Sequence, residues 1–385
     1  FGRRPEGESL RERILANMGD PNVTSQRGLI EMFDSTIGAT TVLMPFGGDT
    51  ARTETQVSVQ KLPVGARHTN TASMMAWGFN PVLTEWSPYH GAAYAVVDAV
   101  AKSVAAGADF RRMRFSYQEY FERMASEEAW GKPLAALLGT LRMQKELGLP
   151  SIGGKDSMSG TFGHISVPPT LIAFGVAPVD AREVISPEFK KPGHGIYLIR
   201  HKALPNRMPD TGALAASWDA LHHEIADGHV CAAYAVGPGG VAEAVAKMTF
   251  GNNLGASISY DADDLFRLDY GSIVAEASEP LDIPGAELIG YVTEEPVLSI
   301  DGTAIPIEEL YEANRIKFTE VYPDRTEVKG DVPEACCERP AVRYEGTPTE
   351  HPVVYLPVFP GTNCDYDMAA AFRAEGAEIR TGVFR

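Results

Sequence analysis

The most informative stretch of this sequence reads Gly153-Gly154-Lys155-Asp156-Ser157-Met158-Ser159-Gly160-Thr161. It contains three glycines, three hydroxyl side chains, one cation and one carboxylate. Glycines let backbone amides approach phosphate oxygens, an ammonium group neutralises their charge, and a carboxylate is a hard oxygen ligand for a metal ion. A compact apolar segment, residues 147–152, precedes it. We therefore expect this stretch to follow the end of a strand. Its composition is the one that a binding site for a triphosphate with magnesium requires.

This stretch does not form a Walker A motif. Gly148 and Gly153 supply the G-x-x-x-x-G frame, but Gly154 then stands where that motif needs Lys. Asp156 stands where the motif needs Ser or Thr. The competing interpretation is a glycine-rich turn that carries polar side chains and binds no phosphate, because chance matches to a phosphate-binding loop of this length are common.

Composition limits the class of protein. The 385 residues predict two or three domains, and 44% hydrophobic with 22% charged residues is typical of a soluble globular protein. The net charge of −17 argues against duplex nucleic acid as a partner, although a nucleotide needs only a local basic pocket. Four cysteines, at positions 231, 336, 337 and 364, are too few and too irregular for a disulfide framework or a zinc site. Without a signal peptide or a membrane-spanning apolar run, we expect a cytoplasmic protein.

A helix predicted over residues 92–106 is apolar on almost all sides and should be buried. Asp98 and Lys102 are its only charges and share one face because they are four residues apart. They form either a mutually satisfied pair or, if Asp98 faces the glycine-rich stretch, a second carboxylate for a metal. His90 and His164 each occur alone, so a structural role is favoured over a catalytic one.

Other elements follow from periodicity and turn residues. A second α/β region begins near Gly195 and ends near residue 322. Within it, Gly237-Pro238-Gly239-Gly240 precedes a helix over residues 241–250 and could bind an anion at its N-terminus. A tight strand-to-helix turn is favoured, because no acid or hydroxyl lies beside these glycines. Further helices are predicted over residues 9–18, 116–128 and 132–147, and strands over residues 56–62 and 167–176.

A third unit begins at His351, after a segment over residues 323–350 that is expected to be a linker. A strand over residues 353–359, a helix over 365–375 and a strand over 378–384 predict the first βαβ unit of an open α/β sheet.

Two further features belong to this last part. Cys364 directly follows the first strand and lacks the small-residue frame of a nucleophile elbow, so a catalytic role is not favoured. The chain opens on Phe1 and closes inside the last predicted strand, as expected for a piece of a longer polypeptide.

Four stretches occur together in one known family. Residues 152–161, 235–245 and 358–365, in this order and together with residues 86–91, resemble phosphoribosylformylglycinamidine synthase of purine biosynthesis. The form they resemble is the large single-chain one, with a glutaminase fused at the C-terminus. The match covers nearly the whole chain from about Ser25, and the order and spacing of the blocks are more specific than any one block.

The resemblance implies an α/β fold. Two α+β sandwich halves of the aminoimidazole ribonucleotide synthetase-like type would be followed by the first βαβ unit of a class I glutaminase-like domain. The implied parts are an incoming linker (1–27), the N-terminal-type half of the second synthetase copy (28–192), its C-terminal-type half (193–322), a linker (323–350) and the truncated start of a glutamine amidotransferase domain (351–385).

The resemblance also implies an activity. The family is an ATP-dependent ligase that converts formylglycinamide ribonucleotide, glutamine and ATP into the amidine, glutamate, ADP and phosphate. ATP activates the formamide oxygen as an iminophosphate, which ammonia from the glutaminase displaces. Magnesium and a phosphate cradle offset charge in that step. The implied partners are the two substrates, the missing first synthetase half and the rest of the glutaminase domain, with no nucleic acid polymer and no membrane.

Site residues are carried over only where the motif matches. Gly154, Lys155, Asp156, Ser157 and Ser159 lie in the block that the family associates with nucleotide phosphate, and Asp156 with magnesium as well.

A second metal carboxylate, Asp98, falls where some relatives carry a metal-binding Glu. Lys102 falls where those relatives carry an Asn ligand, and Gly237-Pro238-Gly239-Gly240 stands where many have an acidic-Gly-Gly loop, without its acid. The resemblance further implies that the second-copy site of large members is an auxiliary, structural nucleotide site.

Asn363 falls in a turn near the glutaminase pocket of the family. The nucleophilic Cys and its His and Glu partners would lie beyond Arg385, so we expect no catalytic residue in this chain. The chain should then neither hydrolyse glutamine nor have complete synthetase activity.

Two other interpretations remain open. The chain could be a degenerate synthetase half that only holds its partner half, which the missing acid and the Asp98/Lys102 pairing favour slightly. It could also be another ATP-using synthetase of the superfamily, such as an aminoimidazole ribonucleotide or selenophosphate synthetase. The glutaminase-like tail from Pro352 argues against that last interpretation.

Overall fold

The computed structural model describes residues 5–36, 39–65, 67–325, 330, 346–347 and 349–384. The chain divides into two units, of which unit 1 is Phe1–Lys61 with Asn70–Arg325 and unit 2 is Leu62–Thr69 with Thr326–Arg385. Cys336, Cys337 and most of the linker expected over 323–350 lie outside the described residues.

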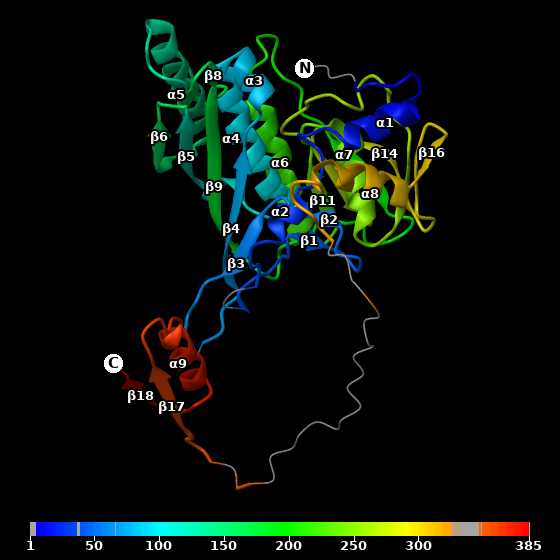
Figure 1. The fold of residues 1–385 in the computed structure, drawn as a ribbon. Helices are drawn as coiled ribbons and strands as arrows, with labels where there is room; N and C mark the ends of the chain where they lie inside the picture. The colour runs from blue at the N-terminus through cyan, green and yellow to red at the C-terminus, as the bar shows by residue number, and fades with distance from the viewer. Residues whose placement is uncertain are drawn as a thin grey trace. The chain divides into compact units, whose positions relative to one another are not determined.

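The first sheet of unit 1 has five strands in the order β3-β4-β9-β5-β6 (Figure 1). β5 and β6 run parallel, whereas the other neighbours are antiparallel. β6 is therefore an edge strand that pairs only with β5 among the described strands. The bounds are β3 (Ser58–Lys61), β4 (Thr71–Gly78), β5 (Arg114–Tyr120), β6 (Ser151–Ser157) and β9 (Thr170–Asp180), with the short pairs β1 (Phe46–Gly47) and β2 (Thr53–Glu54), and β7 (Thr161–Phe162) and β8 (Ile165–Ser166).

The second sheet has seven strands in the order β11-β13-β10-β14-β12-β15-β16. β12 and β15 run parallel, and the other neighbours are antiparallel. The bounds are β10 (Gly195–Ile199), β11 (Val230–Ala235), β12 (Gly255–Ile258), β13 (Ile273–Ala277), β14 (Ala286–Thr293), β15 (Val297–Ile300) and β16 (Thr303–Pro306).

Helix α4 (Pro88–Ala105) lies between the two sheets, where it contacts β4 and β9 on one side and β11 on the other (Figure 1). It begins at Ser87, whose hydroxyl accepts a hydrogen bond from the His90 amide, and continues as a mostly alanine and valine helix. Small side chains suit this position because they let both sheets approach the helix closely. The other helices of this layer are α3 (Pro81–Trp86), α5 (Glu127–Leu147) and α6 (Thr211–Ala226), with the 3-10 turn η2 (Phe110–Arg112).

The second sheet is buried on both faces. Ile273 and Ala275 of β13 join the core that contains α4 and the first sheet, whereas Val274 joins a second core with α1, α7 and α8. Alternation along a strand thus places neighbouring residues in different cores. The helices of the outer layer are α1 (Leu10–Met18), α7 (Gly240–Phe250) and α8 (Ile307–Arg315), followed by η3 (Ile316–Phe318); the short α2 is Arg27–Ile30.

The predicted helices over 9–18, 92–106, 132–147 and 241–250 are confirmed, but two expectations are wrong. Residues 116–128 do not form a helix, since 114–120 form β5, whose alternation buries Phe115 and Tyr117. Described residues of the expected incoming linker, 1–27, belong to the fold, because α1 buries Ile14 and Met18 in the second core.

Unit 2 contains the predicted strand–helix–strand segment. β17 (Val353–Val358) pairs in parallel with β18 (Glu378–Val383), and α9 (Asp365–Ala374) connects them. This confirms the βαβ prediction.

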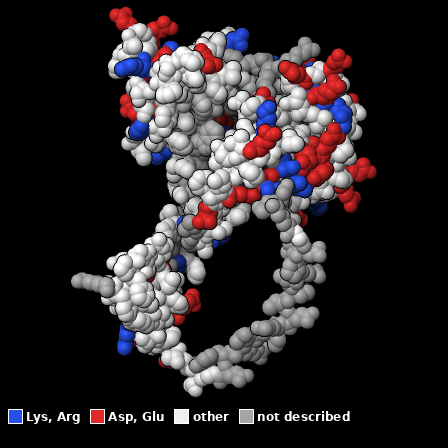
Figure 2. Space-filling view, in the orientation of Figure 1, with Lys and Arg blue, Asp and Glu red and all other residues white. Residues whose placement is uncertain are grey.

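Acidic side chains gather over the part of unit 1 that holds α1 and α8 (Figure 2). Several are paired, as Glu308 is with Arg52 and Glu312 with Arg315. None of the described helices is long and apolar enough to span a membrane.

Candidate functional site

The glycine-rich stretch is a strand rather than a loop that leaves one. Residues 151–157 form β6, and the chain leaves regular structure only at Met158. A Cβ atom at Gly154 would lie 2.3 Å from the Tyr117 carbonyl oxygen, so pairing with β5 requires glycine there. Gly153 has a φ of 153°, which a side chain would disfavour. Strand pairing therefore explains both glycines without a phosphate.

The polar side chains of β6 are accessible to a ligand. Gly154, Lys155, Asp156 and Ser159 are exposed and Ser157 is half-buried. The Lys155 ammonium donates a hydrogen bond to the Ser157 hydroxyl. One cation, one carboxylate and two hydroxyls thus lie along the open edge of the first sheet.

A buried carboxyl group that the sequence pattern does not indicate lies beside this edge. Glu119 of β5 is the register partner of Asp156 and is 7% exposed. Its Oε1 atom has no hydrogen-bond partner. Burial, and secondarily the charge of Asp156, raises the pKa of Glu119 to about 7. The alternation of Phe115, Tyr117 and Glu119 would have revealed it, had residues 114–120 been assigned to a strand.

Asp98 and Lys102 form the predicted ion pair. The Lys102 ammonium lies 2.8 Å from Asp98 Oδ2, donates to the Trp77 carbonyl at 2.9 Å, and lies 4.5 Å from the centre of the Trp77 ring. Asp98 is 4% exposed, and burial raises its pKa. Its other oxygen, Oδ1, has no hydrogen-bond partner.

Helix α7 contains a second pair of the same kind. Glu243-Ala244-Val245-Ala246-Lys247 repeats the pattern Asp98-Ala99-Val100-Ala101-Lys102. The Lys247 ammonium lies 3.0 Å from Glu243 Oε1 and 2.6 Å from Glu54 Oε2 of β2. Glu243 and Lys247 were not identified from the sequence, although an acid and a lysine four residues apart in an apolar helix are a detectable signal.

The turn before α7 has an acid beside it after all. Glu243 Oε2 accepts a hydrogen bond of 2.7 Å from the Gly239 amide and is buried below the turn. The Gly239 amide is one of the backbone donors that an anion at Gly237–Gly240 would need, and it already donates its hydrogen bond to this carboxylate. The structure thus supports the interpretation of a tight strand-to-helix turn.

Both ion pairs line one pocket of about 410 Å³ in unit 1, which we call the acid–lysine pocket. Its charged residues are Glu54, Asp98, Lys102, Glu243 and Lys247. Asp156 is not among its lining residues. Asp98 lies beside the end of β4, which is separated from β6 by β9 and β5, a spacing of roughly 14 Å. The structure therefore does not bring Asp98 and Asp156 together around one ion.

The acid–lysine pocket does not fit a magnesium ion. Magnesium requires several oxygen ligands in octahedral geometry. Here Asp98 Oδ2 is bound to Lys102, and Glu54 and Glu243 are bound to Lys247. Two ammonium groups occupy the positions that a divalent cation would neutralise, and Asp98 Oδ1 is the buried carboxylate oxygen of this pocket without a hydrogen-bond partner.

One group of three side chains with metal-ligating atoms occurs in the described residues, namely His194, Cys231 and Glu276. Glu276 is fully buried, accepts hydrogen bonds from the Lys190 and Lys191 amides, and lies 2.7 Å from His194 Nδ1. Burial raises the pKa of Cys231 to about 12, which keeps the thiol protonated. The three side chains contact one another in a hydrogen-bond network, in which Cys231 Sγ lies 3.6 Å from His194 Nδ1.

Single residues noted in the sequence have structural positions. His90 bridges the Ser87 hydroxyl at 2.8 Å and the Asn206 carbonyl at 3.1 Å, in keeping with a structural role. In unit 2, Asn363 and Cys364 are exposed in the turn before α9.

Comparison with known proteins gives one consistent name. No family model matches the chain. Phosphoribosylformylglycinamidine synthase subunit PurL of Zymomonas mobilis is 25% identical over 283 residues, which cover 67% of this chain and 36% of that subunit. The chain thus spans about a third of the length of this curated relative.

Solved structures show the same fold. Thermotoga maritima PurL complexed with ADP has a TM-score of 0.61 at 17% identity, and covers 88% of this chain and 56% of that one. The same protein complexed with FGAR has a TM-score of 0.61 at 16% identity, with 85% and 56% covered. Curated relatives from several other bacteria and one archaeon carry the same subunit name. This chain is therefore similar to phosphoribosylformylglycinamidine synthase subunit PurL, as its motifs predict.

Proposed function

We propose that this chain is part of an ATP-dependent ligase of purine biosynthesis. The reaction converts formylglycinamide ribonucleotide, glutamine and ATP into formylglycinamidine ribonucleotide, glutamate, ADP and phosphate. Two similarities support the proposal together. The sequence is similar to curated proteins named PurL, and the fold is similar to that of PurL solved in complexes with ADP and with FGAR. Because the chain spans about a third of the curated relative, the activity belongs to the larger assembly.

The edge of β6 is the proposed nucleotide site. Lys155 would neutralise phosphate charge, and Ser157, Ser159 and the Gly154 amide would donate hydrogen bonds to phosphate oxygens. The exposed carboxylate of Asp156 would hold Mg²⁺, which when bound offsets the charge of the phosphates. All of these groups except the half-buried Ser157 are exposed, so a nucleotide can reach them without displacing core residues.

Unit 2 is the proposed start of a glutamine amidotransferase domain. Its parallel β17 and β18 with α9 between them have the arrangement that opens such an α/β domain. Asn363 would lie near the glutamine pocket of the complete domain. We place the enzyme in the cytoplasm, where purine precursors are made.

Calorimetry with ATP and with ADP, each with MgCl₂, tests the nucleotide site. The 385-residue chain should bind with micromolar affinity, about −8 kcal/mol, and Asp156→Ala should lose most of it. Asp282→Ala is the matched control, because this aspartate is also exposed and lies in the other half of unit 1. Equal binding by wild type and Asp156→Ala would reject the site.

A second candidate function is favoured by one observation. Each acid of the acid–lysine pocket already has a lysine partner, as expected of a half that only supports its partner half. Absence of nucleotide binding by the folded wild-type chain would select this scaffold role over the nucleotide site at β6.

A further inference from the structure

Three strands of the second sheet bring a histidine, a cysteine and a glutamate together. His194 directly precedes β10, Glu276 lies on β13 and Cys231 lies on β11, and these strands are neighbours in the order β11-β13-β10. Glu276 is the register partner of Ile196 on one side and of Ala232 on the other. A group built on paired strands is held more precisely than one built on loops. We call these three residues the His-Cys-Glu group.

A β-bulge places Cys231 in this group. Val230 pairs with Ala277 and Ala232 pairs with Glu276, so Cys231 is the additional residue of β11 between two register pairs. A bulge turns a side chain out of the usual alternation of a strand and is common beside functional sites. Here Cys231 Sγ lies 3.6 Å from the Nδ1 atom of His194.

The three ligating atoms are spaced as in a metal centre. Each of them lies within 4.8 Å of the other two. Cys231 Sγ and His194 Nδ1 are 3.6 Å apart, and Zn–S and Zn–N bonds of about 2.3 and 2.0 Å place such atoms about 3.5 Å apart in a tetrahedral site. His194 Nδ1 and Glu276 Oε1 are 2.7 Å apart, as in a hydrogen bond. A small rotation of the half-buried His194 ring would open this pair to the distance of about 3.3 Å that two zinc ligands need.

Backbone groups orient Glu276 as they orient a carboxylate ligand. Glu276 is fully buried, its Oε2 accepts a hydrogen bond of 2.7 Å from the Lys190 amide, and its Oε1 accepts one of 3.0 Å from the Lys191 amide. Outer hydrogen bonds of this kind fix the ligands of metal sites. The ammonium group of Lys190 is itself paired with Glu188, which balances its charge next to the group.

The His-Cys-Glu group can balance the charge of a divalent ion. A thiolate and a carboxylate carry two negative charges, so they form a neutral unit with Zn²⁺ and an imidazole. Neutrality suits the position of Glu276, which lies on the same face of β13 as Val274 of the second core. Binding requires the thiol to release its proton and the imidazole to carry its proton on Nε2. His194 and Cys231 are only half-buried, so an ion can reach them.

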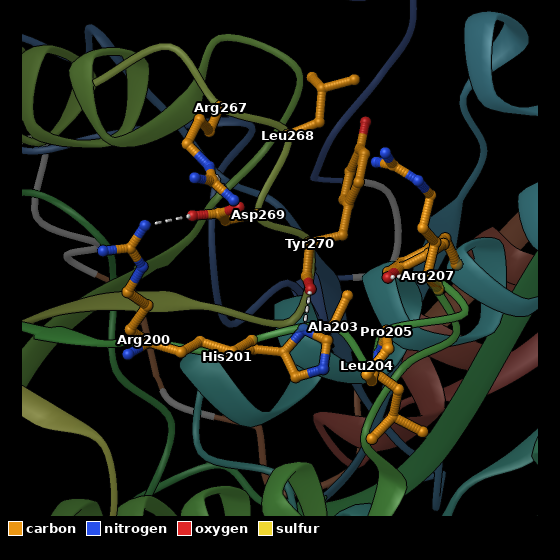
Figure 3. A pocket seen from close by; sticks show the side chains of 12 residues that line it. Arg200, His201, Ala203, Leu204, Pro205, Arg207, Arg267, Leu268, Asp269 and Tyr270 are labelled. Carbon is orange, nitrogen blue, oxygen red and sulfur yellow. Dashed lines mark hydrogen bonds and ion pairs between the residues drawn. The ribbon is translucent and has the colours of Figure 1, made fainter. Parts of the chain in front are cut away.

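His201 differs from His194 in its partners. It lines a cavity of about 460 Å³, where its Nδ1 lies 2.9 Å from the Tyr270 carbonyl (Figure 3). Its Nε2 accepts a hydrogen bond of 3.1 Å from the Asp210 amide. Both nitrogens of that ring are thus bound to backbone groups. His194 Nδ1 instead contacts a carboxylate and a thiol, which are the other two kinds of side-chain ligand that zinc takes.

We propose that His194, Cys231 and Glu276 bind a zinc ion, with water in the fourth position. A sulfur and a nitrogen ligand favour zinc over magnesium and calcium, which prefer oxygen. The spacing along the chain does not indicate this site, because Cys231 lies 37 positions from His194 and 45 from Glu276, unlike the short spacings of zinc motifs. The site is separate from the proposed nucleotide site at β6 and does not depend on it.

Competition with a zinc-binding dye tests the proposal on the reduced 385-residue chain after its treatment with EDTA. The chain should bind one zinc ion with a Kd of about 1 µM or lower. Cys231→Ser and His194→Asn should each weaken binding by at least about tenfold, because each removes one of three protein ligands. Serine and asparagine keep a hydrogen-bond donor at each position, so both variants should fold, which circular dichroism checks. Zinc should also raise the Tm of the wild-type chain and leave that of both variants unchanged.

Cobalt identifies the ligands, because Co²⁺ bound by a thiolate has a charge-transfer absorption in the near ultraviolet. Cys231→Ser should abolish this absorption. Cys364→Ser and His164→Asn change the same residue types at exposed positions outside the group, and should leave the absorption and the zinc affinity unchanged. All chains in the cobalt and zinc measurements carry Cys336→Ser and Cys337→Ser, which remove the adjacent pair of thiols.

Three outcomes would each overturn the proposal. They are the absence of zinc binding by the folded chain, an unchanged zinc affinity in both Cys231→Ser and His194→Asn, and a cobalt–thiolate absorption that persists in Cys231→Ser.

Discussion

At the scale of single residues, the ionisation of Glu119 should make the stability of the fold depend on pH. Its folded pKa of about 7 lies above the 4.5 of an ordinary glutamate, because it is buried beside Asp156. The folded state then holds a proton that the unfolded state releases between these two pH values. Stability is therefore complete below pH 4.5 and declines as pH rises toward 7.

Glu119→Gln should remove this dependence. The shift sets an upper bound of about 3 kcal/mol, and water at the sheet edge reduces the expected gain at pH 8 to about 1–2 kcal/mol. At pH 5 the gain should nearly vanish. Urea unfolding at both pH values measures it, with exposed Glu85→Gln as the control. Equal effects of Glu119→Gln at pH 5 and pH 8 would contradict a raised pKa.

At the scale of elements, the i,i+4 spacing in α4 decides what the acid–lysine pocket can bind. Lys102 supplies a positive charge to Asp98 from one helical turn away. The resemblance places an asparagine ligand at this position in metal-binding relatives. Lys102→Asn would release Asp98 Oδ2 and add an amide oxygen on the same face, giving the pocket oxygen ligands for magnesium.

Lys102→Asn should therefore gain a response to magnesium. Without the ion it leaves a buried carboxylate unpaired, at a cost of about 3 kcal/mol, and its Tm should fall by several degrees. MgCl₂ should restore part of that loss in thermal unfolding and should leave the wild-type Tm unchanged. Lys102→Met removes the ammonium without adding an oxygen and should not recover. Equal recovery of both variants would show that magnesium acts elsewhere.

The elements also show which parts of the fold and site the sequence could predict. The helices α4 and α7 were predictable, because long apolar runs with capping residues have few other structures open to them. β5 was mistaken for a helix because its buried positions include a glutamate, which hides the alternation. β6 was mistaken for a loop because glycine serves equally for close strand pairing at Tyr117 and for phosphate contact.

The acid–lysine pocket could not be predicted from the sequence, for a different reason. Asp98 and Glu243 lie 145 positions apart, and only the packing of α4 against β11 and of α7 on the same strand brings them into one cavity. Their shared pattern was visible, but a pattern of two charges does not specify which elements meet. Tertiary packing supplies that information.

At the scale of the whole molecule, the described cores belong to unit 1. All members of both buried clusters lie between Ile14 and Tyr311. The described part of unit 2 buries only Leu356 and Ala369 among its hydrophobic residues. A two-stranded sheet with one helix and so small a core has marginal stability by itself.

Unit 1 should therefore fold without unit 2. A chain that ends at Arg325 should keep its free energy of unfolding within about 1 kcal/mol of the value for the main transition of the full chain. Leu356→Asp in the full chain should likewise leave that transition unchanged. Val245→Asp is the matched variant in unit 1, where a fully buried charge should lower stability by several kcal/mol. Urea unfolding followed by circular dichroism compares the truncated chain, Leu356→Asp and Val245→Asp with the full chain. A large loss in the free energy of unfolding on truncation would mean that the two units share one cooperative core.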